Sequence, residues 1–417
     1  MRDMLGREEL IPVEKALQIL FQHAPFQLPN EMLTPLEDAY GLVVSRDIIS
    51  PEDLPGFGRS TVDGFAVRAA DTFGATEGLP AYLKLVAEIA MGERPQCALH
   101  KGQCAKIATG GMLPEKADAV VMFEYSQRVE HDSIEVVRPV SPGENVIQAG
   151  EDATKGETIL KRGHRLRPQD VGALAGVGLS EIWTYKKPRV AIIATGDEVV
   201  PAREPLRPGQ VRDINSYTLA GLVSDAGGIA EKKGIFRDEY EIIKDTVRLS
   251  LMHSEIILIT GGSSVGTKDV TARVINDVGS PGVLFHGVAL KPGKPTIGGV
   301  AGSVPIFGLP GHPAAVHICF EVFVRPVLEL QSGAGFDRFG RHRRTLRARV
   351  TRNIASSPGR EEHIGVMIED RNGEPWAVPM LGKSGLITTL TKADGTAIIP
   401  LTKSGVREGD YLEVILF

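Results

Sequence analysis

A chain of 417 residues is too long for one compact core, so we expect about two to four domains. The apolar fraction of 42% and the charged fraction of 24% are those of an ordinary globular protein. The net charge of −5 provides no bulk positive field, which argues against nucleic acid or an anionic membrane as a partner.

Cysteine usage and hydropathy indicate the compartment. Cys97, Cys104 and Cys319 are too few and too scattered for a disulfide framework or a zinc site. Cys97 and Cys104 could pair by spacing, but free thiols are the stronger expectation. The first twenty residues lack the apolar core of a signal peptide, and no stretch approaches the ~20 apolar residues of a membrane span. The reducing cytoplasm is therefore the expected location.

The N-terminal region begins with apolar residues at helical spacing. This spacing predicts a helix over 12–24, where Pro12 is acceptable in the first turn. A second amphipathic stretch covers 33–40, and residues 42–49 read as extended chain. We therefore expect two helical segments followed by a strand.

The texture then changes. From residue 50 to 148, short alternating runs are separated by Gly, Pro and Asp turns, which is typical of a β-rich domain. Residues 159–185 include a short helix that starts at Pro168. We expect this later segment to pack back on the N-terminal helix. Residues 8–49 and 149–187 would then form a discontinuous linking domain with the β-rich domain inserted.

Strands and helices alternate through a central domain of residues 188–335. Runs of Val and Ile in alternating βα units predict a parallel sheet covered on both faces. Ligands of such sheets bind beyond the carboxyl ends of the strands. The expected strands are 189–195, 229–235, 256–260 and 283–290, and the expected helices are 216–226, 239–252, 270–278 and 313–330.

A basic stretch after Arg338 opens a last β-rich domain, residues 340–417. Its arginines at 341, 343, 344, 347 and 349 alternate with apolar positions. We interpret them as a solvated strand face rather than a nucleic-acid patch.

Glycine-rich turns follow several apolar runs of the central domain. The loop G-G-S-S-V-G-T-K-D after 256–260 could hold a phosphate, since glycine lets backbone N–H groups approach an anion. Ser263 and Ser264 can donate hydrogen bonds there. Asp269 could be a metal ligand or simply the N-cap of the next helix. The loop lacks the lysine of a P-loop and the glycine spacing of a dinucleotide fold.

Two further loops carry charge. Asp197 and Glu198 in A-T-G-D-E follow a buried strand, where they suit Mg²⁺ or merely cap the next turn. Lys291 and Lys294 lie in K-P-G-K-P, whose prolines restrict the backbone so that two ammonium groups could face one small dianion. The alternative is an ordinary basic turn.

Two more turns have a structural interpretation. In G-L-P-G-H-P, His312 precedes a proline and is expected to end the loop rather than to act in catalysis. Asp63 and Gly64 in S-T-V-D-G-F-A-V form, taken alone, a hairpin turn.

Together these motifs resemble molybdopterin molybdenumtransferase, the MoeA and gephyrin E-domain family. The resemblance rests on RSTVDGFAVRAADT, IATGGMLPEKADAVVMFE, AIIATGDEVV, DINSYTL, ITGGSSVGTKDVT, ALKPGKPT and GLPGHPAA, in this order over essentially the whole chain. His312 stands where the family commonly has Asn, and Val62 where Met is common.

The resemblance implies an enzyme of molybdenum cofactor biosynthesis that inserts molybdate into adenylylated molybdopterin and releases AMP, with Mg²⁺. The implied fold has a discontinuous N-terminal domain with an inserted β-rich domain, a central α/β domain of the MoaB/MogA type and a C-terminal β-barrel. The family implies a homodimer whose active site lies between the α/β domain of one subunit and the partner's inserted domain. Transient contacts with the molybdopterin adenylyltransferase and with cofactor-accepting enzymes are also implied.

Site residues are carried over from the family position by position. The implied catalytic residues are Asp63, Asp152, Glu198 and Asp269, of which Glu198 and Asp269 would hold the metal. The implied substrate-binding residues are Thr109, Asp197, Asp213, Asn215, Ser216, Asp238, Gly261, Gly262, Ser263, Ser264, Gly266, Pro310 and Gly311. The implied molybdate-binding residues are Lys291, Lys294, Pro295, Arg360 and Ser384.

Two other functions stay open at this stage. An adenylyltransferase acting one step earlier would share the α/β domain, but that reaction needs only the single domain. A non-catalytic scaffold that binds a partner through its dimer is the other alternative, although no long partner-binding linker is evident.

Overall fold

The computed structural model describes residues 10–24, 28–130, 132–261, 265–334, 344–356, 358–382 and 385–417. The chain forms two compact units. The first consists of Met1–Met32, Gly41–Ser45 and Thr184–Phe417, and the second of Leu33–Tyr40 and Arg46–Trp183.

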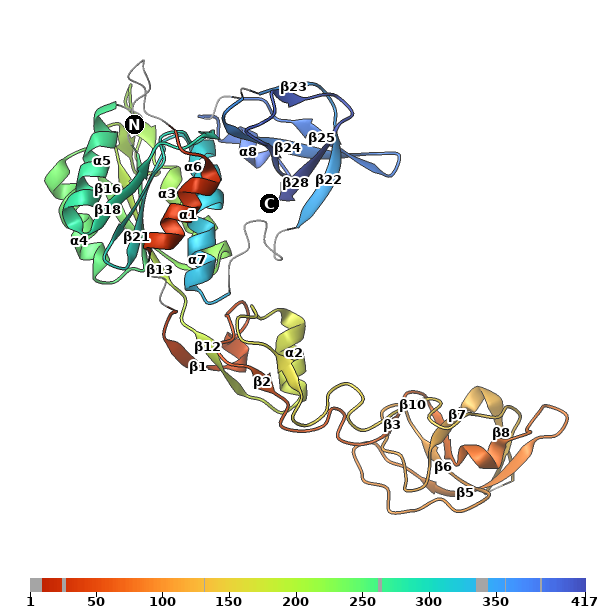
Figure 1. The fold of residues 1–417 in the computed structure, drawn as a ribbon. Coiled ribbons are helices and arrows are strands. Elements are labelled where there is room, and N and C mark those ends of the chain that lie inside the picture. Colours follow the sequence, from red (N-terminus) through yellow and green to blue (C-terminus); the bar gives the residue numbers. More distant parts are fainter. Residues whose placement is uncertain are drawn as a thin grey trace. The chain divides into compact units, whose positions relative to one another are not determined.

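The first unit contains a six-stranded sheet in the order β16-β13-β17-β21-β20-β18 (Figure 1). Neighbours β16, β13, β17 and β21 are parallel, whereas β20 pairs antiparallel with both β21 and β18. The expected parallel sheet is therefore correct for its main part and wrong for β20. The strands are β13 Arg189–Thr195, β16 Ile229–Phe236, β17 Ile256–Gly261, β18 Pro281–His286, β20 Ile297–Ala301 and β21 Val304–Leu309.

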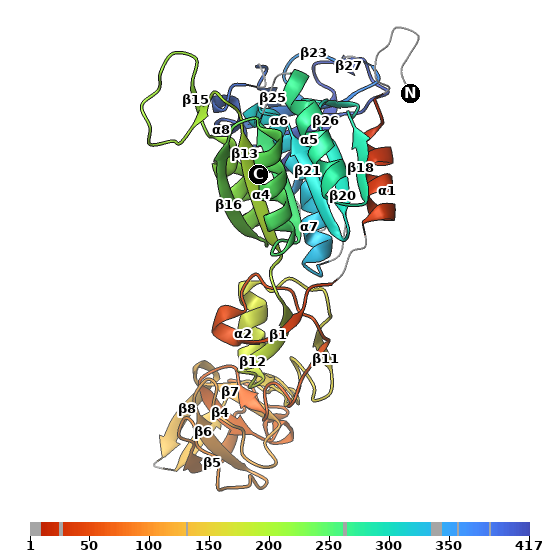
Figure 2. The same cartoon turned by 90° about the vertical axis from the view of Figure 1, so that its left-hand side faces the viewer.

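Helices cover both faces of this sheet, as Figures 1 and 2 show. Val190 and Ile192 of β13 belong to the buried core under the helices of one face, while Ala191 and Ile193 belong to the core under the helices of the other face. This alternation follows from the two-residue period of a strand, which sends successive side chains to opposite faces. Strands buried on both faces explain the continuous Val and Ile runs.

The helices agree with the sequence expectation, with shifted ends. They are α1 Val13–His23, α3 Asn215–Asp225, α4 Tyr240–Leu251, α5 Val265–Val278, α6 Pro313–Cys319 and α7 Arg325–Gln331, with a π-helical turn at Phe320–Val324 between the last two. α5 begins earlier than expected. A short parallel pair, β14 Val199–Val200 and β15 Val211–Arg212, lies beside the sheet.

The helix α1 packs on the α/β sheet rather than on residues 159–185. Val13, Leu17 and Leu20 share a buried core with Phe285 and Val300 of the sheet. Its apolar stripe can be satisfied by any exposed apolar face, and the sequence does not reveal which one is available. The stretch 33–40 is not helical: it forms β1 Glu31–Pro35 and one 3₁₀ turn, because Pro35 restricts the backbone there.

The C-terminal domain is a closed barrel, as the resemblance implied. Strand β24 pairs with both β25 and β26, which closes the sheet order β24-β25-β22-β28-β26. A further strand, β19 Leu290–Lys291, comes from the α/β domain and pairs parallel with β24. The barrel elements are β22 Thr345–Val350, β23 Ile354–Ala355, β24 Glu361–Arg371, β25 Glu374–Pro379, α8 Thr388–Thr391, β26 Gly395–Ile399, β27 Gly405–Val406 and β28 Tyr411–Leu416.

The second unit contains the expected β-rich domain, whose sheet has the order β7-β4-β6-β5-β9-β8. Its strands are β4 Gly64–Val67, β5 Ala81–Glu88, β6 Gln103–Ile107, β7 Ala119–Met122, β8 Ser126–Glu130 and β9 Ser133–Val136. The chain also forms the pairs β1–β12, β2–β11 and β3–β10. These partners are β2 Ile48–Ile49, β3 Arg59–Ser60, β10 Val146–Ile147, β11 Thr158–Leu160 and β12 Glu181–Tyr185, and the helix α2 covers Pro168–Gly176.

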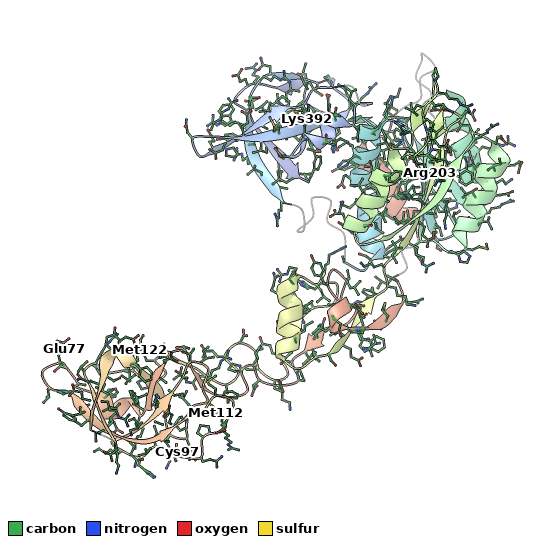
Figure 3. The ribbon with its side chains drawn as sticks, turned by 180° about the vertical axis from the view of Figure 1, so that it is seen from behind. Glu77, Cys97, Met112, Met122, Arg203 and Lys392 are labelled. Atoms are coloured by element: carbon green, nitrogen blue, oxygen red, sulfur yellow. The ribbon has the colours of Figure 1, made fainter. Side chains whose placement is uncertain are left out.

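Several smaller expectations can be compared with the structure. All three cysteines are free, and Cys97 lies in the β-rich domain (Figure 3). In the described part of the chain, no helix is long and apolar enough to cross a membrane. Arg347 and Arg349 stack on the ring of Tyr411, and Arg349 also pairs with Glu374 at 2.6 Å. These two arginines thus belong to a strand face, as interpreted.

Candidate functional site

Three loops leave the same edge of the α/β sheet. In the strand register Thr195 pairs with Gly261, and Thr260 pairs with Leu309, so the loops after β13, β17 and β21 begin side by side. Gly261 has a φ of +147°, and a Cβ placed there would lie 1.9 Å from the carbonyl oxygen of Thr195. Only glycine permits this close approach of the two strand ends.

A cavity of about 370 Å³ opens at this edge, and we call it the sheet-edge cavity. Its lining includes Glu198, Asp213, Asn215, Gly261, Gly311 and His312, together with Gly385 of the barrel domain. Five of the residues expected to bind or transform substrate therefore line one cavity.

Asn215 and Asp213 have different tasks at the start of α3. The Asn215 amide donates hydrogen bonds to Thr260 Oγ1 at 3.0 Å and to the carbonyl oxygen of Gly311 at 2.9 Å, which ties α3 to two of the loops. Its Oδ1 is buried and has no hydrogen-bond partner among the described residues. Asp213 accepts a hydrogen bond from the backbone N–H of the buried Ser216 at 3.0 Å, so it caps the helix.

Three acidic side chains gather near the end of β13. Glu198 is half-buried and lines the cavity, whereas Asp197 is exposed and does not. Burial raises the pKa of Asp238, the Thr195 hydroxyl opposes that shift, and the carboxylates of Asp197 and Glu198 add to it. Asp238 Oδ1 is buried with no hydrogen-bond partner in the described ranges. The site thus contains carboxylates that repel one another.

Buried residues of the α/β domain hold the backbone of the K-P-G-K-P loop in place. Gly293 has a φ of +131°, and a Cβ there would meet Cys319 Sγ at 2.6 Å. The fully buried Thr296 donates a hydrogen bond from Oγ1 to the carbonyl oxygen of Gly293 at 2.7 Å and contacts Cys319 Sγ at 3.0 Å. Burial raises the pKa of the Cys319 thiol to about 12, so this sulfur stays protonated and packs as a small apolar group.

The loop faces a second cavity of about 620 Å³, which we call the dilysine cavity. Lys291, Lys294 and Pro295 line it from the α/β domain, and Arg360 lines it from the barrel domain. His312 lines both cavities, so the two are neighbours. As expected, His312 has an extended backbone and directly precedes α6, where Pro313 takes the first position. Pro310 also lines the dilysine cavity.

One of the two lysines is already engaged by a carboxylate. Lys291 Nζ lies 2.7 Å from Glu362 Oε1, and Ser356 Oγ donates a hydrogen bond to Glu362 Oε2 at 2.7 Å. No signal in the K-P-G-K-P motif indicated this partner, because Glu362 lies far along the chain in the barrel domain.

The second unit contains Asp63, Thr109 and Asp152. Asp63 Oδ1 accepts hydrogen bonds from the Thr109 backbone N–H at 2.7 Å and from Thr109 Oγ1 at 3.0 Å. These two donors hold the pKa of Asp63 below its ordinary value. Asp152 is exposed, and its backbone N–H donates to the carbonyl oxygen of Leu54 at 3.0 Å.

Part of the expected site lies outside the described residues. Gly262, Ser263, Ser264 and Ser384 belong to this part. Gly266 and Asp269 lie within the helix α5, so Asp269 does not occupy the N-cap position. Gly382 and Gly385, on either side of residues 383–384, line the dilysine cavity and the sheet-edge cavity respectively. Within the described ranges, no group of three or more His, Cys, Asp or Glu side chains has the geometry of a metal site.

Comparison with known protein families gives the class. The MoeA N-terminal region (domain I and II) matches residues 11–178, the "probable molybdopterin binding domain" matches 191–330, and the MoeA C-terminal region (domain IV) matches 347–417. The class is therefore a multidomain protein of the MoeA type, whose α/β domain matches the probable molybdopterin binding domain.

Individual relatives extend over nearly the whole chain. The molybdopterin molybdenumtransferase of Bacillus subtilis is 31% identical over 99% of this chain and 95% of its own. Molybdopterin molybdenumtransferase 2 of Mycobacterium tuberculosis is 32% identical over 91% of this chain and 93% of its own. The crystal structure of the molybdopterin biosynthesis MoeA protein of Pyrococcus horikoshii OT3 is 33% identical, with a TM-score of 0.83 over 98% of this chain and all of that chain. The chain belongs to the MoeA family, the molybdopterin molybdenumtransferases.

Proposed function

We propose that this protein inserts molybdate into adenylylated molybdopterin and releases AMP, giving the molybdenum cofactor. The observation that carries the proposal is the convergence of Lys291, Lys294 and Arg360 on one cavity next to the glycine loops of the sheet edge. Molybdate is a tetrahedral dianion, and ammonium and guanidinium groups are its natural hydrogen-bond donors. The relatives' names as molybdenumtransferases support the same assignment.

Each of the two cavities would hold a different anionic group of the proposed substrates. The dilysine cavity would take molybdate, and the sheet-edge cavity would take the phosphate-bearing part of the adenylylated substrate. The backbone of Gly261 and the start of α3 line the sheet-edge cavity, where N–H groups suit phosphate oxygens. Because both cavities share His312, the oxyanion and the scissile phosphate linkage would be neighbours.

The direct test is a turnover assay with the purified chain. Adenylylated molybdopterin, Mg²⁺ and molybdate are added, and AMP is measured by chromatography. We expect AMP release that depends on molybdate. AMP release that does not depend on molybdate would contradict the proposal. Adenylylated molybdopterin formed from ATP and molybdopterin would instead indicate an adenylyltransferase.

We propose further that the reaction requires a divalent cation held by Glu198 and Asp269. Glu198 and the unsatisfied Oδ1 of Asn215 are oxygen donors at the sheet-edge cavity, the type that Mg²⁺ prefers. Mg²⁺ often uses only one or two protein carboxylates and completes its shell with phosphates and water. When bound, the ion would neutralise negative charge on the departing phosphate. Activity that survives exhaustive chelation would exclude this requirement.

We propose that the working enzyme is a homodimer whose active sites combine the first unit of one subunit with the second unit of the other. The support is the family resemblance and the presence of Asp63 and Thr109 outside the first unit. Mixed dimers of Lys294→Met and Asp63→Ala subunits provide a test. In a shared site one of the two active sites is intact and activity returns, whereas sites within single subunits would all remain defective. Light scattering gives the oligomeric state independently.

We also propose that the protein works in the cytoplasm. The support is its three free cysteines, two of which are buried. Fractionation of the source cells, followed by immunodetection, tests this location.

A further inference from the structure

The ion pair between Lys291 and Glu362 joins the dilysine loop to the barrel. Strand β19 is added parallel to β24, and its register places Lys291 directly beside Glu362. The Glu361 backbone N–H also donates to the carbonyl oxygen of Ala289 at 2.8 Å. The backbone therefore fixes the two side chains as neighbours, and their 2.7 Å contact follows from the strand pairing.

The carboxylate of this pair is largely buried and held by two contacts, whereas the ammonium is accessible. The Glu362 side chain is 11% exposed, and Ser356 Oγ holds its second oxygen at 2.7 Å. The Lys291 side chain is 48% exposed. A largely buried carboxylate that lost its cation would be strongly destabilised, so the pair persists when a ligand enters. An ammonium group has three N–H donors, and only one is needed for Glu362.

The charges around the cavity can be counted. Lys291, Lys294, Arg360 and Glu362 all line it. In the described part of the chain, no acidic side chain forms an ion pair with Lys294 or Arg360. Three cationic groups and one carboxylate leave a charge of about +2, which matches the charge of one tetrahedral dianion.

We propose that Glu362 is a residue of the oxyanion site that positions Lys291 and sets the affinity for the oxyanion. It holds the Lys291 ammonium at one place while two N–H donors stay available to the oxyanion. Its negative charge also lowers the net charge of the cavity to a value that matches one dianion. The oxyanion therefore binds reversibly before it is transferred. This inference rests on the proposed molybdate-inserting function.

The test separates the charge of Glu362 from its hydrogen bonds. In Glu362→Gln the amide can still accept from Lys291 and contact Ser356, but the negative charge is lost. We expect molybdate to bind about tenfold more tightly by calorimetry, with a steeper dependence on ionic strength. Sulfate and phosphate should compete more strongly by a similar factor. Glu362→Asp keeps the charge and should show no gain in affinity, which also guards against a folding defect in the glutamine variant.

Two further variants identify the route of the effect. In a Lys291→Met background, Glu362→Gln should increase the affinity clearly less than tenfold, because the part of the effect that acts through Lys291 is lost. Glu374→Gln removes the same charge from another ion pair of the barrel domain, with Arg349, and should leave molybdate binding unchanged.

The outcomes that overturn the inference are distinct from those that overturn the proposed function. Unchanged or weaker molybdate binding by Glu362→Gln rejects the role of Glu362, as does a full tenfold gain in the Lys291→Met background. If the wild-type chain binds no molybdate at all, the proposed function itself fails, and this inference fails with it.

Discussion

The dilysine cavity of the first unit and the Asp63 turn of the second unit treat their charged groups in opposite ways. Asp63 has its hydrogen-bond partner within the second unit, since both hydrogen bonds to its Oδ1 come from Thr109. Lys291, Lys294 and Arg360 instead line an open cavity, and the single acid paired with Lys291 is itself anchored by Ser356.

The difference shows which motif residues are free for a ligand. An acid that accepts two hydrogen bonds from one residue of a neighbouring loop stabilises that contact whatever else it does. Converging cations gain nothing from each other, so a cavity that gathers them is explained by an anion. Asp213, which caps α3, behaves like Asp63.

Both units also rely on glycine where two backbones approach closely. A Cβ on Gly261 would lie 1.9 Å from the Thr195 carbonyl oxygen, and one on Gly64 would lie 2.0 Å from that of Val121. Each Gly→Ala substitution should cost more than about 4 kcal/mol or prevent folding of its unit. The two tryptophans report separately, Trp183 on the second unit and Trp376 on the first.

Matched controls for these substitutions are helical glycines with open space. Gly221→Ala in α3 and Gly172→Ala in α2 meet no atom within 4 Å, and each should stabilise its helix by up to about 1 kcal/mol. Wild-type unfolding curves for Gly261→Ala or Gly64→Ala would show that the strand ends are not as close as described.

Asp170 is an acid of the second unit with a purely structural role, and its effect on stability should depend on pH. Asp170 is buried and accepts hydrogen bonds from Arg167 and from His164 Nε2, and the Arg167 contact is the main reason that its pKa is held far below the ordinary value. Asp170→Asn should lose about 3 kcal/mol at neutral pH, because Arg167 and His164 lose their charged partner.

The pH dependence has a defined sign. A depressed folded-state pKa stabilises the protein above the unfolded pKa of about 3.9, and this stability is lost as the pH falls below it. The gap between wild type and Asp170→Asn should therefore be full at pH 7 and shrink below about pH 4. Trp183 fluorescence during urea unfolding at several pH values measures it. A gap that is constant with pH would contradict the ionic assignment.

Removing one cavity cation tests the functional half of the comparison. Lys294→Met deletes a charge-assisted donor worth about 2–3 kcal/mol, so molybdate-dependent kcat/KM should fall by about 30- to 150-fold. Stability and binding of adenylylated molybdopterin should be unchanged. Lys403→Met, on an exposed turn of the barrel domain, is the matched control. Equal losses in both variants would indicate a general charge effect.

The Asp63 turn offers the direct way to break the comparison. Asp63→Asn keeps an oxygen that can accept from Thr109, so the fold of the turn should be little affected. If the acid also has the catalytic role implied by the family, AMP release should fall by about tenfold or more despite the intact fold. Full activity in Asp63→Asn would make this carboxylate a structural group only.

Much of the α/β domain was predictable because its signals are local. The continuous apolar run at 189–195 predicts a buried strand, and the apolar residues of 239–252 recur with helical spacing. The structure has a strand and a helix there. The antiparallel β20 was missed although a signal existed: two apolar runs flank the Gly302-Ser303 dipeptide, which favours a tight hairpin. The regular alternation of strands and helices expected for the whole domain left no place for this hairpin.

The candidate site divides in the same way. Backbone restrictions select Gly and Pro at particular positions. The sequence therefore reveals Gly261, the K-P-G-K-P loop and His312 before Pro313. The placement of α1 on the sheet, the pairing of β19 with β24 and the contact of Lys291 with Glu362 leave no such mark.

By itself, the sequence determined the kinds of element, the positions of the turns and the family of motifs. Local periodicity and the special backbone needs of Gly and Pro are properties of neighbouring residues. Only the tertiary structure decided which charges share a cavity and which are already neutralised. Glu362 lies beside Lys291 because β19 of the α/β domain pairs with β24 of the barrel.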